Sequence, residues 1–174
     1  MKRKRILLFF LPILAVLTVT GCLSARAENA DAAQSCTISI CCATILDRME
    51  LLDPEKIELV PEDGWLLAPT VVPFSAGESV FDVLERTCRQ NGIHMEFENT
   101  PIYDSAYIEG IGNLYEFDCG ELSGWMYRVN GRFPNYGCSR YALQSGDVIE
   151  WVYTCDLGAD VGGAYAAGGE SEKP

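Results

Sequence analysis

Cysteine and histidine are the residue types through which this chain could most readily do chemistry. The 174-residue sequence contains eight cysteines but a single histidine, His94. A Ser-His-Asp or Cys-His arrangement needs that histidine beside a nucleophile, and the sequence gives no reason to place it there. No two cysteines have the Cys-x-x-Cys spacing of zinc sites, and Asp156 and Asp160 do not fit a calcium loop. The sequence therefore predicts neither an enzyme nor a metal centre.

The N-terminus has the pattern of a bacterial secretory signal. Four basic residues at 2–5 precede an apolar run at 6–19, which is shorter than the roughly 20 residues of a membrane-spanning helix. The run ends in Val19-Thr20-Gly21-Cys22, which resembles a lipobox, so Cys22 is predicted to be diacylated and to become the mature N-terminus. The alternative is a conventional signal peptide cleaved after residues 25–27. The first case predicts a protein anchored to the outside of the cell membrane, and the second a secreted protein.

The remaining cysteines predict disulfides, because an exported chain with many thiols typically oxidises them. Once Cys22 is assigned to the lipid, seven are left, and an odd number leaves one free or paired between molecules. The preferred pairs are Cys42 with Cys155, which would join two strands, and Cys119 with Cys138, which would pin an intervening loop. The sequence does not determine this connectivity. It also leaves open the state of Cys36, Cys41 and Cys88.

Size and charge predict one acidic domain. Residues 1–21 would be the signal peptide, 22–36 a flexible tether, 37–163 the folded domain and 164–174 a disordered tail. The folded part is long enough for a single core. The formal net charge of −12 disfavours binding to nucleic acid and electrostatic docking on anionic lipid, so the lipid anchor is the expected contact with the membrane.

Hydrophobic periodicity predicts several strands around one main helix. The helix is expected at about 79–91, where Ser79 and Asp82 can form a capping box and Gly92 supplies a left-handed end. A shorter helix is expected at 44–52. The expected strands lie at 37–41, 65–67, 71–74, 93–97, 106–108, 114–117, 125–129 and 148–154, with Pro69 separating the second from the third. This pattern predicts an α+β fold, in which the apolar stripe of the helix lies on a sheet.

Aromatic residues are concentrated between residues 119 and 158. They are Trp125, Tyr127, Phe133, Tyr136, Tyr141, Trp151 and Tyr153. Rigid aromatic area suits a small core and a ligand face equally well. Trp125 and Tyr127 should share one face of a strand that ends in the turn Asn130-Gly131, and core packing explains them as well as a site does. The loop at 132–139 is the better site candidate, because a fixed turn presents its tyrosine and asparagine.

The chain resembles the DUF4430 family, also described as the transcobalamin-like C-terminal domain. The segments that carry the resemblance are EGI at 109–111, YEFDCGELSGWMY at 115–127, VNG at 129–131, PNYG at 134–137 and GDVIEW at 146–151. The resemblance implies a β-grasp fold, in which a small twisted mixed sheet packs on one main helix, and it implies an extracellular bacterial protein. In vitamin B12 carriers, the related domain closes over one face of cobalamin while a helical domain holds the other. That helical partner is not expected in this chain.

The resemblance also implies which residues would bind a ligand. They are Trp125, Tyr127, Pro134, Asn135, Tyr136, Gly137 and Tyr141. The predicted function is that of an exported, lipid-anchored, non-enzymatic module that binds a small ligand, for which cobalamin, another corrinoid or another flat cofactor is the candidate. The alternative is a cell-surface interaction or structural module without a small ligand. A redox role for the odd cysteine is a third hypothesis, and it would require an exposed thiol with a depressed pKa.

Overall fold

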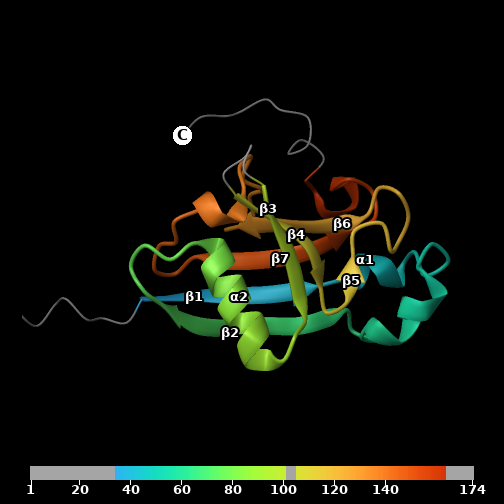
Figure 1. The fold of residues 1–174 in the computed structure, drawn as a ribbon, viewed down its shortest axis with the longest axis horizontal. Helices are drawn as coiled ribbons and strands as arrows, with labels where there is room; N and C mark the ends of the chain where they lie inside the picture. Colours follow the sequence, from blue (N-terminus) through green and yellow to red (C-terminus); the bar gives the residue numbers. More distant parts are fainter. Residues whose placement is uncertain (1–33, 101–104, 164–174) are drawn as a thin grey trace, which may run out of the picture. The chain divides into compact units, whose positions relative to one another are not determined.

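The computed structural model describes residues 34–100 and 105–163 (Figure 1). The predicted signal peptide, the lipidation site Cys22, most of the predicted tether and the predicted tail lie outside the described residues. Within those two ranges, no helix has the length and apolar character needed to cross a membrane.

A four-stranded mixed sheet forms the base of the domain. Its strand order is β2 (Trp65–Phe74), β1 (Gln34–Cys41), β7 (Val148–Thr154) and β6 (Gly124–Val129). The neighbours β1 and β7 are parallel, whereas β1 with β2 and β6 with β7 are antiparallel. The predicted strands 37–41, 125–129 and 148–154 are thus confirmed, although β1 begins three residues earlier, at Gln34.

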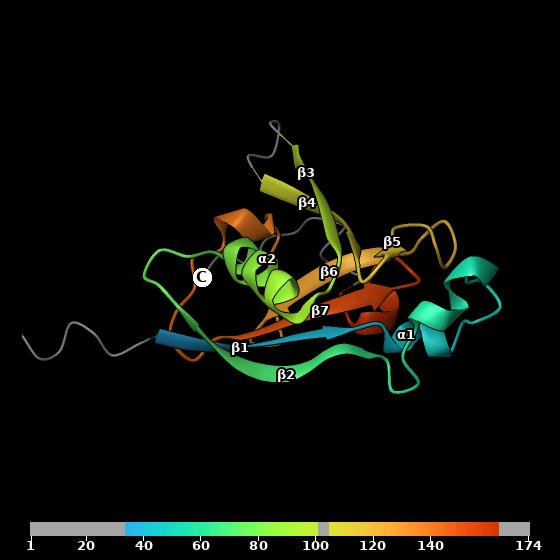
Figure 2. The ribbon, with the colours of Figure 1, turned by 60° about the horizontal axis from the view of Figure 1, so that its bottom comes forward.

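The helix α2 (Val80–Asn91) lies across one face of this sheet (Figures 1 and 2). The predicted capping box is present: the amide of Asp82 donates to Oγ of Ser79, and the carboxylate of Asp82 accepts from the amide of Ser79. Gly92 ends the helix at φ 66°, in the left-handed conformation that favours glycine. The buried helix residues Val80, Val83, Leu84 and Cys88 join the inward side chains of the sheet in one core cluster. The predicted α+β class, with a mixed sheet packed on one main helix, is confirmed.

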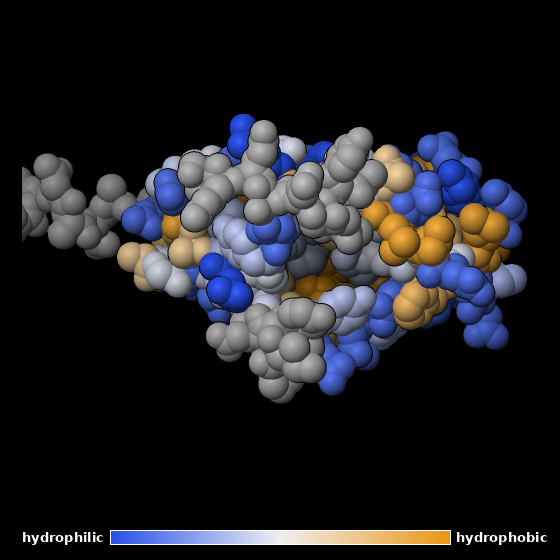
Figure 3. All heavy atoms as spheres, turned by 90° about the horizontal axis from the view of Figure 1, so that it is seen from above, coloured by the Kyte–Doolittle hydropathy of each residue, from blue (hydrophilic) through white to orange (hydrophobic). Residues whose placement is uncertain are grey.

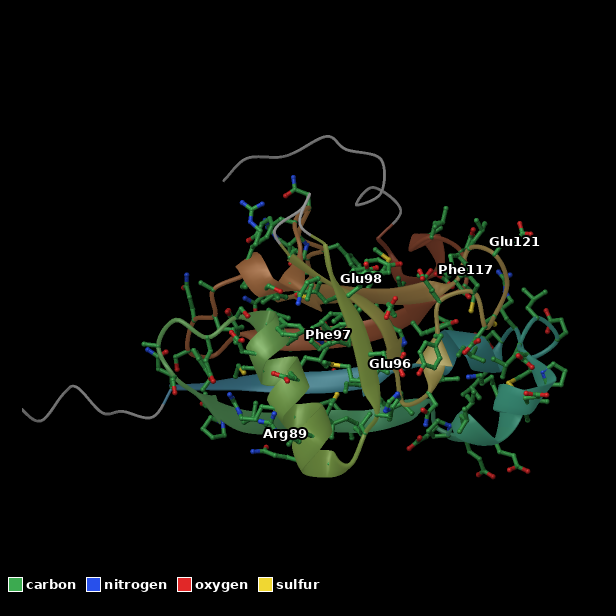
Figure 4. The ribbon with its side chains drawn as sticks, viewed as in Figure 1. Arg89, Glu96, Phe97, Glu98, Phe117 and Glu121 are labelled. Atoms are coloured by element: carbon green, nitrogen blue, oxygen red, sulfur yellow. The ribbon has the colours of Figure 1, made fainter. Side chains whose placement is uncertain are left out.

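A second, three-stranded sheet stands on the same side as α2, and its separation from the first sheet was not predicted. It comprises β3 (Met95–Thr100), β4 (Ser105–Ile111) and β5 (Leu114–Tyr115). Figure 2 shows β3 and β4 rising beside the helix. Phe97 of β3 packs edge-on against Phe81 of α2, with ring centroids 4.7 Å apart. Figure 4 shows Phe97 between the two elements. The small sheet therefore lies beside the helix, on the same face of the large sheet (Figure 2).

The expected helix at 44–52 is wrong in length. The helix α1 (Ala43–Leu46) has four residues, and its N-cap Cys42 makes no capping bond. Two four-residue turns follow, in which the amides of Arg48 and Leu51 donate to the carbonyls of Ile45 and Arg48, respectively. A 3-10 helix, η1 (Pro54–Leu59), comes next. Short turns replace the longer helix because the apolar residues do not form one continuous buried face. Ile45 is buried, whereas its neighbour Leu46 is exposed.

The two extended pieces expected at 65–67 and 71–74 form one continuous strand, β2. It tolerates Pro69 for two reasons. It lies at the edge of the sheet, where a missing backbone donor is acceptable. The pairing also shifts register, because Ile38 faces Thr70 whereas Ile40 faces Leu67. Two β2 residues, one of them the proline, are thereby accommodated opposite a single β1 residue, as in a bulge.

Candidate functional site

Four aromatic side chains form a continuous group at one edge of the large sheet. Tyr127 of β6 faces its register partner Trp151 of β7, and their ring centroids are 5.5 Å apart. The ring of Tyr141 stands edge-on to Tyr127, at 6.5 Å, and is stacked on Tyr136 at 5.9 Å with an interplanar angle of 18°. These residues, Tyr127, Tyr136, Tyr141 and Trp151, are called the aromatic group below. Exposure rises along it, from the buried Trp151 to Tyr136, whose side chain is 44% exposed.

The loop that carries Tyr136 is fixed by contacts to three elements. The hydroxyl of Tyr127 donates to the carbonyl of Tyr136 at 2.6 Å. The amide of Ala106 in β4 donates to Oγ of Ser139 at 3.0 Å, and the amide of Val80 in α2 donates to the carbonyl of Tyr141 at 3.1 Å. The exposed ring of Tyr136 is therefore presented by a backbone that is held from both sides.

Gly137 allows this loop to come close to β4. A Cβ at this position would overlap the side chain of Ser105, so the approach requires glycine. The neighbouring Pro134 is half-buried and Asn135 is exposed. Of the predicted site residues, Tyr127, Tyr136 and Tyr141 thus belong to the aromatic group, and Pro134, Asn135 and Gly137 flank Tyr136 in its loop.

Trp125 is placed elsewhere. Its indole Nε1 donates to the carbonyl of Leu114 at 2.8 Å, and its ring stands edge-on to Tyr153 at 5.2 Å. It packs partly against the main core and partly against a second buried cluster at the α1 end of the sheet. The predicted alternation of β6 is correct, because Arg128 lies on the other face and pairs with Glu150. Trp125 therefore packs β6 against the core and does not belong to the aromatic group.

The hydroxyls of Tyr127 and Tyr141 are neutral hydrogen-bonding groups. Burial raises the pKa of Tyr127 strongly and also raises the pKa of Tyr141. The buried Trp151 was not predicted as a site residue. Its indole Nε1 has no hydrogen-bond partner among the described residues, which is uncommon for a buried donor. Its position beside Tyr127 depends on the register of β6 and β7, and the sequence does not specify that register.

The predicted disulfides are not present. No S–S bond joins any of the seven cysteines in the described part of the chain. Cys138 lies in the main core, where its Sγ contacts the carbonyl of Ala106, whereas Cys119 lies in the second cluster. The predicted pair Cys119–Cys138 is therefore wrong, because its two sulfurs belong to different clusters. The predicted pair Cys42–Cys155 is also not formed, and the sulfur that Cys155 contacts is that of Cys119.

A separate open depression lies at the start of α2. It has a volume of about 540 Å³ and is lined by residues that include Glu78, Asp82, Arg86 and Arg89; Figure 4 shows Arg89 on the helix. Arg86 is already paired with Glu78 and with the carbonyl of Pro73. This depression is polar and internally paired, so it does not suit a flat apolar ligand.

Comparison with known proteins supports the predicted resemblance. The chain carries a match to DUF4430, a domain of unknown function, over residues 77–155. A solved structure of haptocorrin in complex with Cbi has 18% sequence identity and a TM-score of 0.53; the match covers 79% of this chain and 29% of haptocorrin. This similarity shows a shared fold, and the chain spans less than a third of the haptocorrin chain. No curated protein matches the sequence.

A second solved structure is that of a protein from Ruminococcus gnavus ATCC 29149 that is described as a candidate for metal binding. It has 15% identity and a TM-score of 0.41, over 70% of this chain and 96% of that chain. A similarity at this level carries no argument about the site.

Proposed function

We propose that this chain is an exported, lipid-anchored, non-enzymatic module that binds a flat small ligand, with a corrinoid as the leading candidate. The observation that carries the proposal is the stacked pair of Tyr136 and Tyr141. One face of the Tyr136 ring rests on Tyr141, and the side chain remains 44% exposed. A flat ligand can stack on the free face at little entropic cost, because the loop beneath it is already ordered.

The similarity in fold supports this choice of ligand. Haptocorrin was solved in complex with Cbi, a corrinoid, and it shares the fold of this chain over 79% of the chain. Most of haptocorrin has no counterpart here, so a second protein surface would cover the opposite face of the ligand. The net charge of −12 disfavours anionic ligands. We therefore expect cobinamide or cobalamin to bind more tightly than haem, which carries two carboxylates.

The test is a titration of the purified protein with cobinamide, cobalamin and haem, followed by absorbance and by thermal denaturation. We expect a saturable absorbance change and a rise in Tm with a corrinoid, since a ligand that binds the folded state stabilises it. Tyr136→Ala should abolish both. Tyr107→Ala is the matched control, because Tyr107 is 50% exposed on β4 and lies outside the aromatic group. Binding that survives Tyr136→Ala, or no binding of any of the three compounds, would contradict the proposal.

A second candidate function, that of a protein-interaction module, is favoured by the opposite end of the domain. Phe117, Leu122 and Leu157 are 63%, 45% and 56% exposed. Phe117 and Leu157 have φ values of 69° and 45°, and bulky residues rarely adopt this left-handed conformation without a reason. Figure 3 shows apolar side chains gathered at this end, and Figure 4 shows Phe117 there with the acidic Glu121.

The chemistry of this end defines the partner. Acidic residues next to the apolar ones, such as Glu121 and Asp156, disfavour a second copy of the chain and favour a partner with an apolar centre and a basic rim. Binding of an amphipathic Leu/Lys model helix should weaken in Phe117→Ser. It should persist in Val71→Ser, a matched control on the edge strand at 70% exposure. Equal binding by both variants would exclude this surface.

A further inference from the structure

Two buried cysteines from distant parts of the chain meet in the second cluster. Cys119 is fully buried and Cys155 is 6% exposed. Their Sγ atoms are 3.4 Å apart. The cluster that contains them also includes Cys42, Ile45 and Tyr153.

The backbone on each side of this contact is held independently. The amide of Cys119 donates to Oγ of Ser123 at 3.1 Å, and the amide of Cys155 donates to the carboxylate of Asp160 at 2.7 Å. The thiol of Cys119 also lies 3.6 Å from the carbonyl of Arg48. A disulfide has an S–S length of about 2.05 Å, so the two sulfurs need to approach by a little over 1 Å, which side-chain rotation can supply.

We propose that Cys119 and Cys155 form a disulfide in the folded protein. The Sγ–Sγ bond forms as each thiol loses its proton, and the two electrons and two protons pass to a small disulfide oxidant, which leaves as two thiols. The bond would tie the loop at 117–123 to the end of β7. It does not depend on the proposed ligand, because Trp151 belongs to the main core cluster and Tyr127 and Tyr141 pack against that cluster, whereas the two cysteines lie in the second cluster.

The surroundings favour a structural bond over a redox-active one. Burial raises the pKa of Cys155 to about 12, and burial also raises the pKa of Cys119. Reactive exchange cysteines have lowered pKa values and exposed sulfurs, and these two have the opposite properties. Once closed, the bond should therefore persist, and the redox hypothesis for these cysteines is disfavoured.

The connectivity can be read directly by peptide mapping. The protein is unfolded, refolded with oxidised and reduced glutathione, alkylated without reduction and digested with trypsin. Cleavage after arginine separates the relevant thiols, because residues 90–128 hold Cys119, 133–140 hold Cys138 and 141–174 hold Cys155. We expect peptide 90–128 linked to peptide 141–174. Alkylated Cys119 and Cys155, or a link from either to another cysteine, would overturn the proposal.

Reduction provides a second measurement. Closing a loop of this length by a disulfide typically raises Tm by about 10 °C in a domain of this size, so dithiothreitol should lower the Tm of the refolded protein by that amount. The Cys155→Ala variant should be insensitive to dithiothreitol. Cys88→Ala is the matched control, because Cys88 is buried in the other cluster, and it should keep the full sensitivity. Equal sensitivity of both variants would refute the bond.

Discussion

Replacing Tyr153 by phenylalanine tests the hydrogen bonding that organises the α1 end of the domain. Tyr153 is fully buried, and its hydroxyl donates to the carbonyl of Tyr115 at 2.6 Å and lies 3.0 Å from Oγ of Ser123. Phenylalanine keeps the ring and its edge-on contact with Trp125. The change therefore isolates one hydroxyl group within a packed site.

The expected cost follows from the partners left behind. The carbonyl of Tyr115 also accepts from the amide of Asp118 at 3.3 Å, and Oγ of Ser123 still donates to the carbonyl of Gly120 at 2.8 Å. No buried group loses every partner, so the loss should lie at the lower end of the usual range, about 1 to 1.5 kcal/mol. For a domain of this size that corresponds to a fall in Tm of roughly 3 to 9 °C.

Thermal denaturation followed by circular dichroism measures this change. Tyr107→Phe is the control, because its hydroxyl contacts Glu116 on a half-exposed side chain, and such surface changes usually stay within about 0.5 kcal/mol. An unchanged Tm for Tyr153→Phe would mean that the hydroxyl makes no net contribution. A loss above about 3 kcal/mol would mean that removing it disrupts the loop, contrary to the two surviving bonds.

Three further predictions address other parts of the fold. Gly137→Ala should lower the free energy of unfolding by about 1 to 3 kcal/mol through overlap with Ser105, and Ser105→Gly in the same chain should restore much of it in urea denaturation. Ser79→Ala should cost about 1 kcal/mol by the same measurement, because it removes the acceptor for the amide of Asp82. The free energy of unfolding should fall as the pH rises above 9, because burial raises the pKa of Cys88 from its ordinary 9.0 to about 12 and the unfolded chain therefore loses this proton at a lower pH than the folded one. The measurement is the urea midpoint as a function of pH, in the wild type and in Cys88→Ala. Equal pH dependence of the two midpoints would contradict the prediction.

Local signals in the sequence predicted the elements that local interactions determine. The capping box of Ser79 and Asp82 determines where α2 begins, and the left-handed Gly92 determines where it ends. The turn Asn130-Gly131 was predicted from two residues, and both have positive φ values, 52° and 75°. In each case the residues that decide the conformation are adjacent in the sequence.

Long-range arrangements could not be predicted in the same way. The separation of β3, β4 and β5 into a second sheet depends on how they pack beside α2, and alternation within each strand does not reveal it. The contact between Cys119 and Cys155 depends on where the loop before β6 meets the end of β7. The candidate site shows the same division: Tyr136 and Tyr141, five residues apart in the sequence, were both predicted as site residues, whereas Trp151 joins them through strand pairing.

Trp125 contacts both the main core cluster and the second cluster. A substitution of Trp125 therefore cannot test either cluster alone. Its ring packs against the main core and against the second cluster, and its Nε1 donates to the carbonyl of Leu114. A substitution there should therefore weaken the support of the aromatic group and the packing around Cys119 together. Tyr136 is the better probe of ligand binding, because its exposed ring can be removed without opening a core. Cys155 is the better probe of the disulfide, because its sulfur contacts that of Cys119. Binding and thiol oxidation should then respond to separate substitutions, which is the outcome expected if the two clusters act independently.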